Sequence, residues 1–217
     1  MTRMIHHTTA GMSMIAALAL AGCGNPAKDV TPAEVGEPQT DVTEPTAEAP
    51  SAEAIAYEIS SDSTIRFVGS KVTGSHDGGF KSFNGSIAVA DGSLLAAGSA
   101  VEIDMASTWT DTDRLTGHLK SGDFFGVEEN PTSTFVFTSV KPSGEEFGIT
   151  ISGDLTLHGV TRNISFPAQV KISDEKLMLK SEFYIKRFDF EITYPGKTDD
   201  LIREEVVIRL AILAAPA

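Results

Sequence analysis

The sequence is poor in cysteine and in clustered positive charge. Cys23 is the one cysteine among 217 residues, so no disulfide can form within the chain. The 17 Lys and Arg residues form no basic run and are outnumbered by 30 Asp and Glu, which gives a net charge of -13. Because nucleic-acid phosphates are bound by clusters of Lys and Arg, this balance argues against nucleic acid as a partner.

The N-terminal apolar stretch is too short to cross a bilayer as a helix, which takes about 20 residues. It occupies residues 11–21, follows Arg3, and ends in Leu20-Ala21-Gly22-Cys23. This pattern resembles a secretory signal that ends in a bacterial lipobox, whose cysteine becomes the acylated N-terminus. We therefore expect residues 1–22 to be a signal peptide and Cys23 to be a lipid-attachment site. An ordinary signal with a chance cysteine is the alternative.

An acylated Cys23 would place the protein in the cell envelope, anchored to a membrane and facing the periplasm. Two or three acyl chains anchor firmly, since each buried methylene contributes about 0.8 kcal/mol. Gly24 follows the cysteine where inner-membrane lipoproteins of enteric bacteria carry Asp, so the outer membrane is favoured.

Residues 24–56 contain no aromatic residue. They hold five of the ten prolines and seven acidic residues against one lysine, Lys28. Such a composition buries too little apolar surface to offset the loss of chain entropy. We expect residues 23–56 to form a disordered acidic linker that holds a domain of residues 57–217 away from the membrane.

Beyond Tyr57, apolar residues alternate with polar ones, which is typical of strands with one buried face. Turn residues such as those of His76-Asp77-Gly78-Gly79 separate the segments. Eight short segments of this kind predict an all-β antiparallel barrel or sandwich. They are residues 64–68, 86–89, 100–105, 134–140, 147–157, 164–172, 177–185 and 206–212.

Residues 111–122 break the alternation and predict a short helix. Asp111 or Asp113 is suited to cap it, and Leu115 and Leu119 would share one face. A helix inserted between barrel strands commonly covers or flanks one end of the barrel.

The sequence also lacks a recognisable catalytic or metal-binding arrangement. It has no Gly-x-Ser-x-Gly motif, and its one thiol is the expected lipid-attachment site. His118 and His158 are forty residues apart and lack the further ligands of a metal site, so we predict neither metal nor cofactor. Three acids near aromatic residues, Asp104, Asp123 and Asp189, leave a paired-carboxylate glycosidase open on residues alone.

Seven motifs in order across residues 57–214 resemble the YceI family of lipocalin-like bacterial proteins. They are Phe67-Val-Gly-Ser-Lys71, Gly79-Phe-Lys-Ser-Phe-Asn-Gly85, Glu102-Ile-Asp-Met105, Leu115-Thr-Gly-His-Leu-Lys-Ser-Gly-Asp-Phe-Phe125, Asn130-Pro131, Gly153-Asp-Leu-Thr-Leu-His-Gly-Val-Thr161 and Arg187-Phe-Asp-Phe190. The resemblance implies an extended eight-stranded antiparallel barrel with an inserted helix. It also implies a long apolar cavity for a polyisoprenoid, a quinone-like lipid or another long-chain amphiphile. Some members of the family pair as homodimers.

The candidate ligand-binding residues are large apolar side chains from the strand faces that share one parity and from the helix. They are Phe67, Phe83, Trp109, Leu115, Leu119, Phe124, Phe135, Phe137 and Phe183. Lys71, His118 and Arg187 are candidates for contact with a polar head, because long polar side chains at an opening stay hydrated.

Three classes of function follow. The protein is a module that binds, carries or stores a lipid, or a structural envelope protein whose barrel is packed solid, or an enzyme that acts on such a lipid. For any single aromatic residue, a place in a solid core is the simpler interpretation. A cavity inside the barrel would distinguish the first class from the second.

Overall fold

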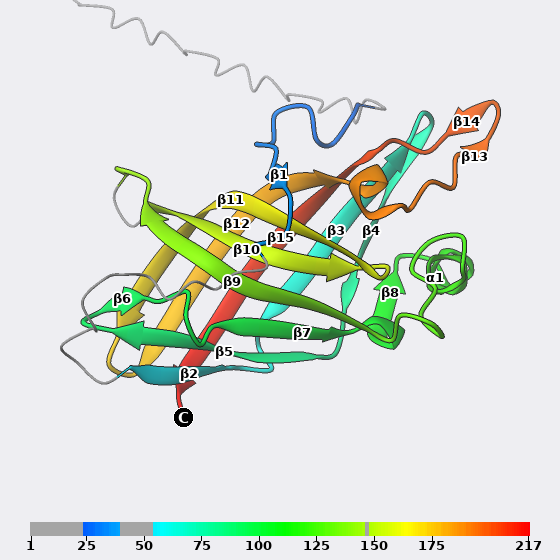
Figure 1. Ribbon diagram of the computed structural model, residues 1–217. Coiled ribbons are helices and arrows are strands. Elements are labelled where there is room, and N and C mark those ends of the chain that lie inside the picture. The colour runs from blue at the N-terminus through cyan, green and yellow to red at the C-terminus, as the bar shows by residue number, and fades with distance from the viewer. Residues whose placement is uncertain (1–23, 40–53, 146–147) are drawn as a thin grey trace, which may run out of the picture.

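The structure, a computed structural model, describes residues 24–39, 54–145 and 148–217. The expected signal peptide and Cys23 lie outside these residues. Eight antiparallel strands close into a ring, so the predicted barrel is confirmed and a sandwich is excluded (Figure 1). In order around the ring they are β2 (Ile55–Ile59), β5 (Phe83–Ala90), β7 (Ala100–Asp104), β9 (Thr132–Pro142), β10 (Gly148–Leu157), β11 (Val160–Ser173), β12 (Lys176–Lys186) and β15 (Glu205–Pro216).

The wall is longer on one side of the barrel. β15 pairs with β2 near its end and with β3 (Thr64–Lys71) along residues 207–211. β3 continues the sheet into β4 (Gly74–Phe80) and β8 (Thr108–Thr110). The remaining short elements are β6 (Ser93–Leu94), the hairpin of β13 (Gly196–Lys197) and β14 (Asp200–Leu201), and two 3₁₀ turns, η1 (Met105–Ser107) and η2 (Arg187–Phe190).

The alternation in the sequence identifies the inward faces. Along β12, Leu177, Leu179, Phe183 and Ile185 are buried, whereas Lys176 and Lys180 are exposed. Each of the eight segments predicted from alternation contains or overlaps a strand of the structure. Every second side chain of a strand points to the same face, so the apolar parity becomes the interior of the barrel.

β4 was not among the predicted strands, because its glycines resemble a turn. Gly78 instead lies within the strand, where a Cβ would stand 2.4 Å from Cζ of Phe67. At Gly79 a Cβ would stand 2.6 Å from the carbonyl oxygen of Ile65. The glycines are therefore required by close packing against β3 and the Phe67 ring rather than by a reversal of the chain.

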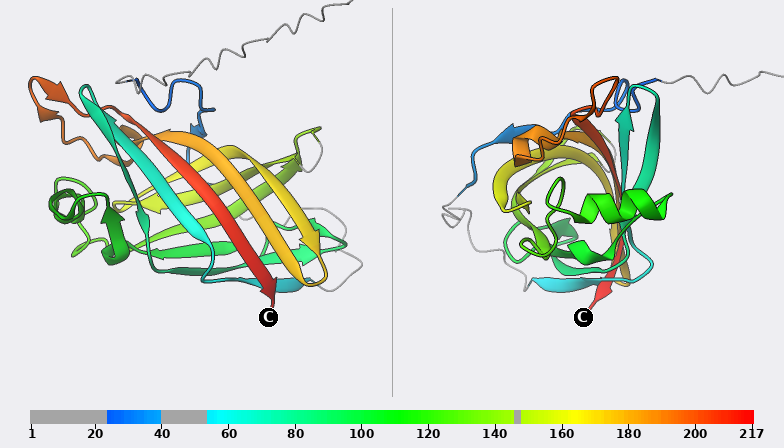
Figure 2. Two further views of the ribbon diagram at one scale, coloured as in Figure 1. Left: turned by 180° about the vertical axis from the view of Figure 1, so that it is seen from behind. Right: turned by 90° about the vertical axis from the view of Figure 1, so that its right-hand side faces the viewer.

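The predicted helix is present as α1 (Asp113–Lys120), but its cap differs from the prediction. Thr112 occupies the N-cap position and makes no capping hydrogen bond with its side chain, while Asp113 lies in the first turn. Asp111 instead pairs with His76 of β4 at 2.9 Å. α1 lies across one end of the barrel (Figure 2). In the described part of the chain, no helix is both long and apolar enough to cross a membrane.

The linker prediction for residues 23–56 is wrong for residues 24–39, which are docked on the barrel. β11 and β12 pair with each other along residues 169–173 and 176–180 and separate beyond them, and the N-terminal segment fills the space between. β1 (Glu34–Gly36) pairs with residues 163–165 of β11. On its other side, Tyr184 of β12 donates to the carbonyl of Thr31 at 3.0 Å and accepts from the amide of Ala33 at 2.8 Å.

This docking uses backbone hydrogen bonds more than apolar burial. Ala27 is the one residue of the segment that is more than nine-tenths buried, and it packs with Val68 of β3 and Val207 of β15. A composition with few apolar residues can therefore still be ordered when the edges of two separated strands supply donors and acceptors.

Candidate functional site

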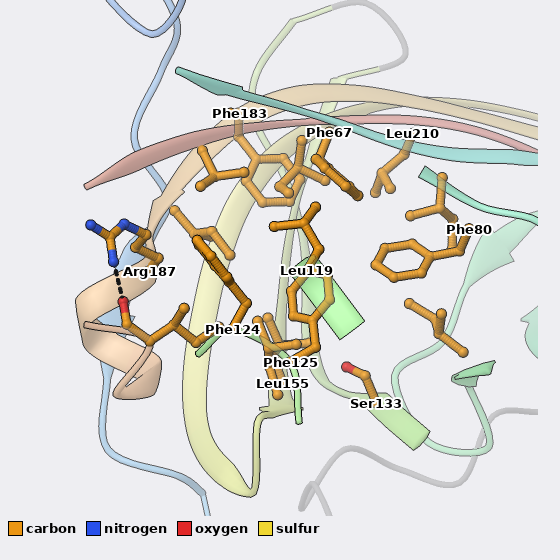
Figure 3. Close-up of a pocket in the computed structure, with 18 of the residues that line it drawn as sticks. Phe67, Phe80, Leu119, Phe124, Phe125, Ser133, Leu155, Phe183, Arg187 and Leu210 are labelled. Carbon is orange, nitrogen blue, oxygen red and sulfur yellow. Dashed lines mark hydrogen bonds between the residues drawn. The ribbon is translucent and has the colours of Figure 1, made fainter. Parts of the chain in front are cut away.

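The barrel encloses a cavity of about 500 Å³. This volume lies within the range of about 300–1,000 Å³ that is typical of sites for small molecules. Most of the wall is formed by inward side chains of β3, β9, β10, β11, β12 and β15, with smaller contributions from β2, β4, β5 and β7. The helical end is formed by α1 and the Phe124-Phe125 pair (Figure 3). The interior is therefore not packed solid.

The cavity lining is aromatic and aliphatic through most of its depth. Phe166 and Phe183 stack with ring centroids 4.1 Å apart, and Phe135 lies 5.6 Å from Phe166. Nearer α1, the ring of Phe125 contacts those of Phe67 and Phe80, with centroid separations of 6.3 Å and 6.1 Å. Such a surface binds hydrocarbon by removing it from water, at about 25 cal/mol per Å² of apolar ligand area before ordering costs.

Glycines keep two of these rings against the wall. A Cβ on Gly153 of β10 would stand 2.3 Å from Cζ of Phe135, so the ring of Phe135 lies directly over the backbone. Gly78 accommodates Phe67 in the same manner. At both positions the absence of a side chain lets the tip of the ring lie over the backbone of the neighbouring strand.

Seven of the nine apolar candidates line the cavity. They are Phe67, Leu115, Leu119, Phe124, Phe135, Phe137 and Phe183. Phe83 packs against the core at the start of β5 but does not reach the cavity. Trp109 lies outside the wall, with Arg66 of the exposed face of β3 at 5.9 Å from its ring. Trp109 belongs to β8, a strand absent from the prediction, so its parity was not available from the sequence.

The three polar candidates also line the cavity, but each already has partners within the protein. Lys71 forms an ion pair with Asp200. The Nε2 atom of His118 lies 2.8 Å from a carboxylate oxygen of Asp123, and its ring contacts Phe124 and Tyr194 edge-on at 5.0 Å.

Arg187 is held by the backbone around it. Its guanidinium donates to the carbonyl oxygens of Ile192 at 2.5 Å, Arg203 at 3.0 Å and Ile202 at 3.2 Å. Burial lowers the pKa of this guanidinium, and the charge of Glu204 opposes the shift. The arginine is 4% exposed. These contacts favour a structural role for Arg187, holding the segment of residues 192–203 at the end of β12, over contact with a head group.

The opening of the cavity lies at the end covered by α1. It is bordered by the last residues of β3, by α1, and by the β13–β14 hairpin with the residues that flank it. Polar residues at this opening were absent from the sequence prediction: Ser70, His76, Arg114, Lys197, Asp200 and Arg203. They come from four separated segments, and only Ser70 lies within one of the motifs quoted above.

A metal centre finds no support in the described residues, which contain no group of three or more His, Cys, Asp or Glu that could hold an ion. His158 adopts a positive φ of 52° in the turn between β10 and β11, and its Nδ1 lies 3.2 Å from the carbonyl oxygen of Phe190. This histidine is occupied in fixing that turn to η2.

Comparison with known proteins gives a consistent result. The barrel resembles the crystal structure of Burkholderia cenocepacia BcnA, with a TM-score of 0.62, 21% identity, and coverage of 70% of this chain and 96% of that one. It also resembles a polyisoprenoid-binding domain from Saccharophagus degradans implicated in plant cell wall breakdown, with a TM-score of 0.61, 20% identity, and coverage of 75% and 99%. At these identities the two structures show the fold alone.

Sequence relatives extend over most of the same region. A UPF0312 protein of Pseudomonas putida strain W619 is 30% identical over 167 residues, which cover 71% of this chain and 85% of the relative. A UPF0312 protein of Pseudomonas aeruginosa is 39% identical over 93 residues, which cover 43% and 48%. The family model for the YceI-like domain matches residues 57–214, from within β2 to near the end of β15, and the chain therefore belongs to the YceI-like family.

Proposed function

We propose that the protein binds one long-chain amphiphile, a polyisoprenoid or quinone-like lipid, and carries or stores it in the cell envelope. The observation that carries the proposal is the apolar cavity of about 500 Å³ inside the barrel, which a solid core would not contain. The structural similarity to a polyisoprenoid-binding domain supports a chain-like ligand. The proposal assigns binding rather than catalysis.

The envelope location rests on the sequence before the described residues. We propose that Cys23 is acylated and that the signal of residues 1–22 is removed. Cys23→Ser should move the protein from the membrane to the soluble periplasmic fraction. Wild-type protein that is itself soluble and carries no acyl group would contradict the anchor, but it would leave the binding proposal intact.

The first test of binding is the content of the purified protein. An organic extract analysed by mass spectrometry should contain a long-chain lipid in roughly equal molar amount to the protein. Protein purified without bound lipid that also takes up none from added polyprenol would overturn the proposal in favour of the structural alternative.

A variant distinguishes a cavity from a packed core. Phe137 lines the cavity and is 6% exposed, so Phe137→Trp should place the larger ring in the empty space, lower lipid retention and leave the melting temperature unchanged. The matched control is Phe83→Trp, because Phe83 packs against the core without lining the cavity. There we expect overpacking to cost about 1–3 kcal/mol while lipid retention stays as in the wild type.

A further inference from the structure

Positive charge gathers at the opening of the cavity, although the protein as a whole is strongly acidic. The cavity lining includes five Lys or Arg side chains and one carboxylate, that of Asp200. The five are Lys71, Arg114, Arg187, Lys197 and Arg203. In a chain with 17 basic and 30 acidic residues, this local reversal of sign marks the opening as a place suited to an anion.

Most of the other charged groups around the opening are already neutralised. Lys71 pairs with Asp200, and Arg187 is held by backbone carbonyls with Glu204 nearby. The two histidines of the lining each lie beside a carboxylate, His76 beside Asp111 and His118 beside Asp123.

Three cationic side chains remain without a carboxylate. Within residues 24–39, 54–145 and 148–217, no ion pair involves Arg114, Lys197 or Arg203. Arg114 and Lys197 are exposed at the rim, on α1 and β13, whereas Arg203 is partly buried just before β15. These cations come from α1 and from the segment of residues 196–203, and an anion at the opening would supply the negative charge that they lack.

Two buried polar atoms at the same place have no hydrogen-bond partner. Among the described residues, Oγ of Ser70 and Nε of Arg203 are the buried side-chain atoms left unpaired. Ser70 is 5% exposed and lines the cavity, and its carbonyl accepts from the amide of Arg203 at 2.9 Å, so the two residues are neighbours. Buried donors are nearly always paired in folded proteins, and an unpaired one is unfavourable. Both atoms can donate to an oxygen anion.

We infer that the opening binds an anionic head group, a phosphate or a carboxylate, on the lipid whose chain occupies the cavity. Arg203 and Ser70 donate to the anion at the inner end of the opening, and Arg114 and Lys197 neutralise its charge from the rim. Phosphate and carboxylate oxygens match the guanidinium of Arg203 in charge and geometry. This inference rests on the proposed function and specifies its ligand.

The test compares lipids that differ in the head alone. Purified full-length protein is titrated with geranylgeranyl phosphate and geranylgeraniol, and separately with palmitate and hexadecanol, each displacing a fluorescent lipid probe. We expect at least one anion to bind about tenfold more tightly than its own alcohol at low ionic strength, and the preference to shrink as salt is added. The pair with the larger preference identifies the head as phosphate or carboxylate.

Variants assign the preference to residues. Arg203→Met with Ser70→Ala should remove the preference and leave the affinity for the alcohols as in the wild type. If this double variant does not fold, Arg114→Met with Lys197→Met serves instead, since both side chains are exposed and should reduce the preference at least threefold. Arg209→Met is the matched control, because Arg209 lies on the exposed outer face of β15 and pairs with Glu182.

The outcomes separate the two proposals. Equal affinity for anion and alcohol in the wild type overturns the head-group site but leaves lipid binding standing. A preference that survives in both double variants overturns the assignment to these residues. Failure of all four lipids to bind overturns the proposed function itself.

Discussion

Arg187→Met tests whether the buried arginine holds the wall at the opening of the cavity. Methionine keeps much of the apolar stem and removes the guanidinium, so carbonyl oxygens of Ile192, Ile202 and Arg203 lose their donor. A hydrogen bond to a charged group contributes about 1.5–3 kcal/mol, but three bonds that share one guanidinium are not additive. The desolvation of the charge also offsets part of the gain, so we expect a loss of about 3–5 kcal/mol in the free energy of unfolding.

The effect is measured by urea denaturation and by thermal melting. For a protein of this size, the expected loss corresponds to a decrease of about 6–20 °C in melting temperature. Hydrogen exchange should accelerate first at the amides of Ile202 and Arg203, which donate to Pro195 and Ser70. Arg187→Lys is the control and should recover less than half of the loss, because an ammonium cannot reach three carbonyls in a fork. A loss below about 1 kcal/mol for Arg187→Met would refute the structural role.

Three further predictions concern the wall and the opening. The hydrogen bond from Lys71 holds the pKa of Asp200 below its usual 3.8, so the carboxylate stabilises the fold above that value and this contribution is lost as pH falls through the lowered pKa. The difference in melting temperature between wild type and Asp200→Asn should therefore be constant from about pH 5 to 8 and disappear in strong acid. A difference that persists in strong acid would contradict the assignment. Gly153→Ala should push the Phe135 ring into the cavity, lowering lipid retention and stability by about 1–3 kcal/mol, whereas Gly74→Ala, whose Cβ would meet nothing within 4 Å, should be neutral in both assays. A chain that begins at Ala54 lacks the docked segment and exposes the free edges of β11 and β12. Its free energy of unfolding should fall by about 2–4 kcal/mol, and light scattering should detect aggregation. An unchanged melting temperature would show that the docking is not stabilising.

The barrel was predictable because most of its strands have one face in the interior and one in water. In β12, the alternation of Leu177, Leu179 and Phe183 with lysines indicates one buried face and one exposed face. The same parity placed Phe135 and Phe137 in the cavity, since neighbouring positions of one parity share a face. Trp109 was misplaced because its strand is three residues long, too short for a period to be read.

Features that depend on contacts between distant segments were not predictable. Gly78 and Gly79 resemble a turn in the sequence, and the close packing of aromatic rings from β3 and β8 over them is seen only in the folded sheet. The cationic opening joins Ser70 to Arg203, which are far apart in the chain and carry no common pattern. Residues 24–39 dock through backbone hydrogen bonds, which the amino-acid composition of a segment does not reveal.

The docked N-terminal segment alters how the protein would sit on a bilayer if Cys23 carries lipid as proposed. Ala27 is fixed against Val68 and Val207 and follows the attachment point by four positions, so the chain between them reaches at most about 14 Å. Val68 precedes Ser70 of the opening by two residues. The short tether would then hold the barrel close to the bilayer, with its opening beside the lipid headgroups. An amphiphile leaving the bilayer could enter the cavity along that surface, with little of its chain exposed to water.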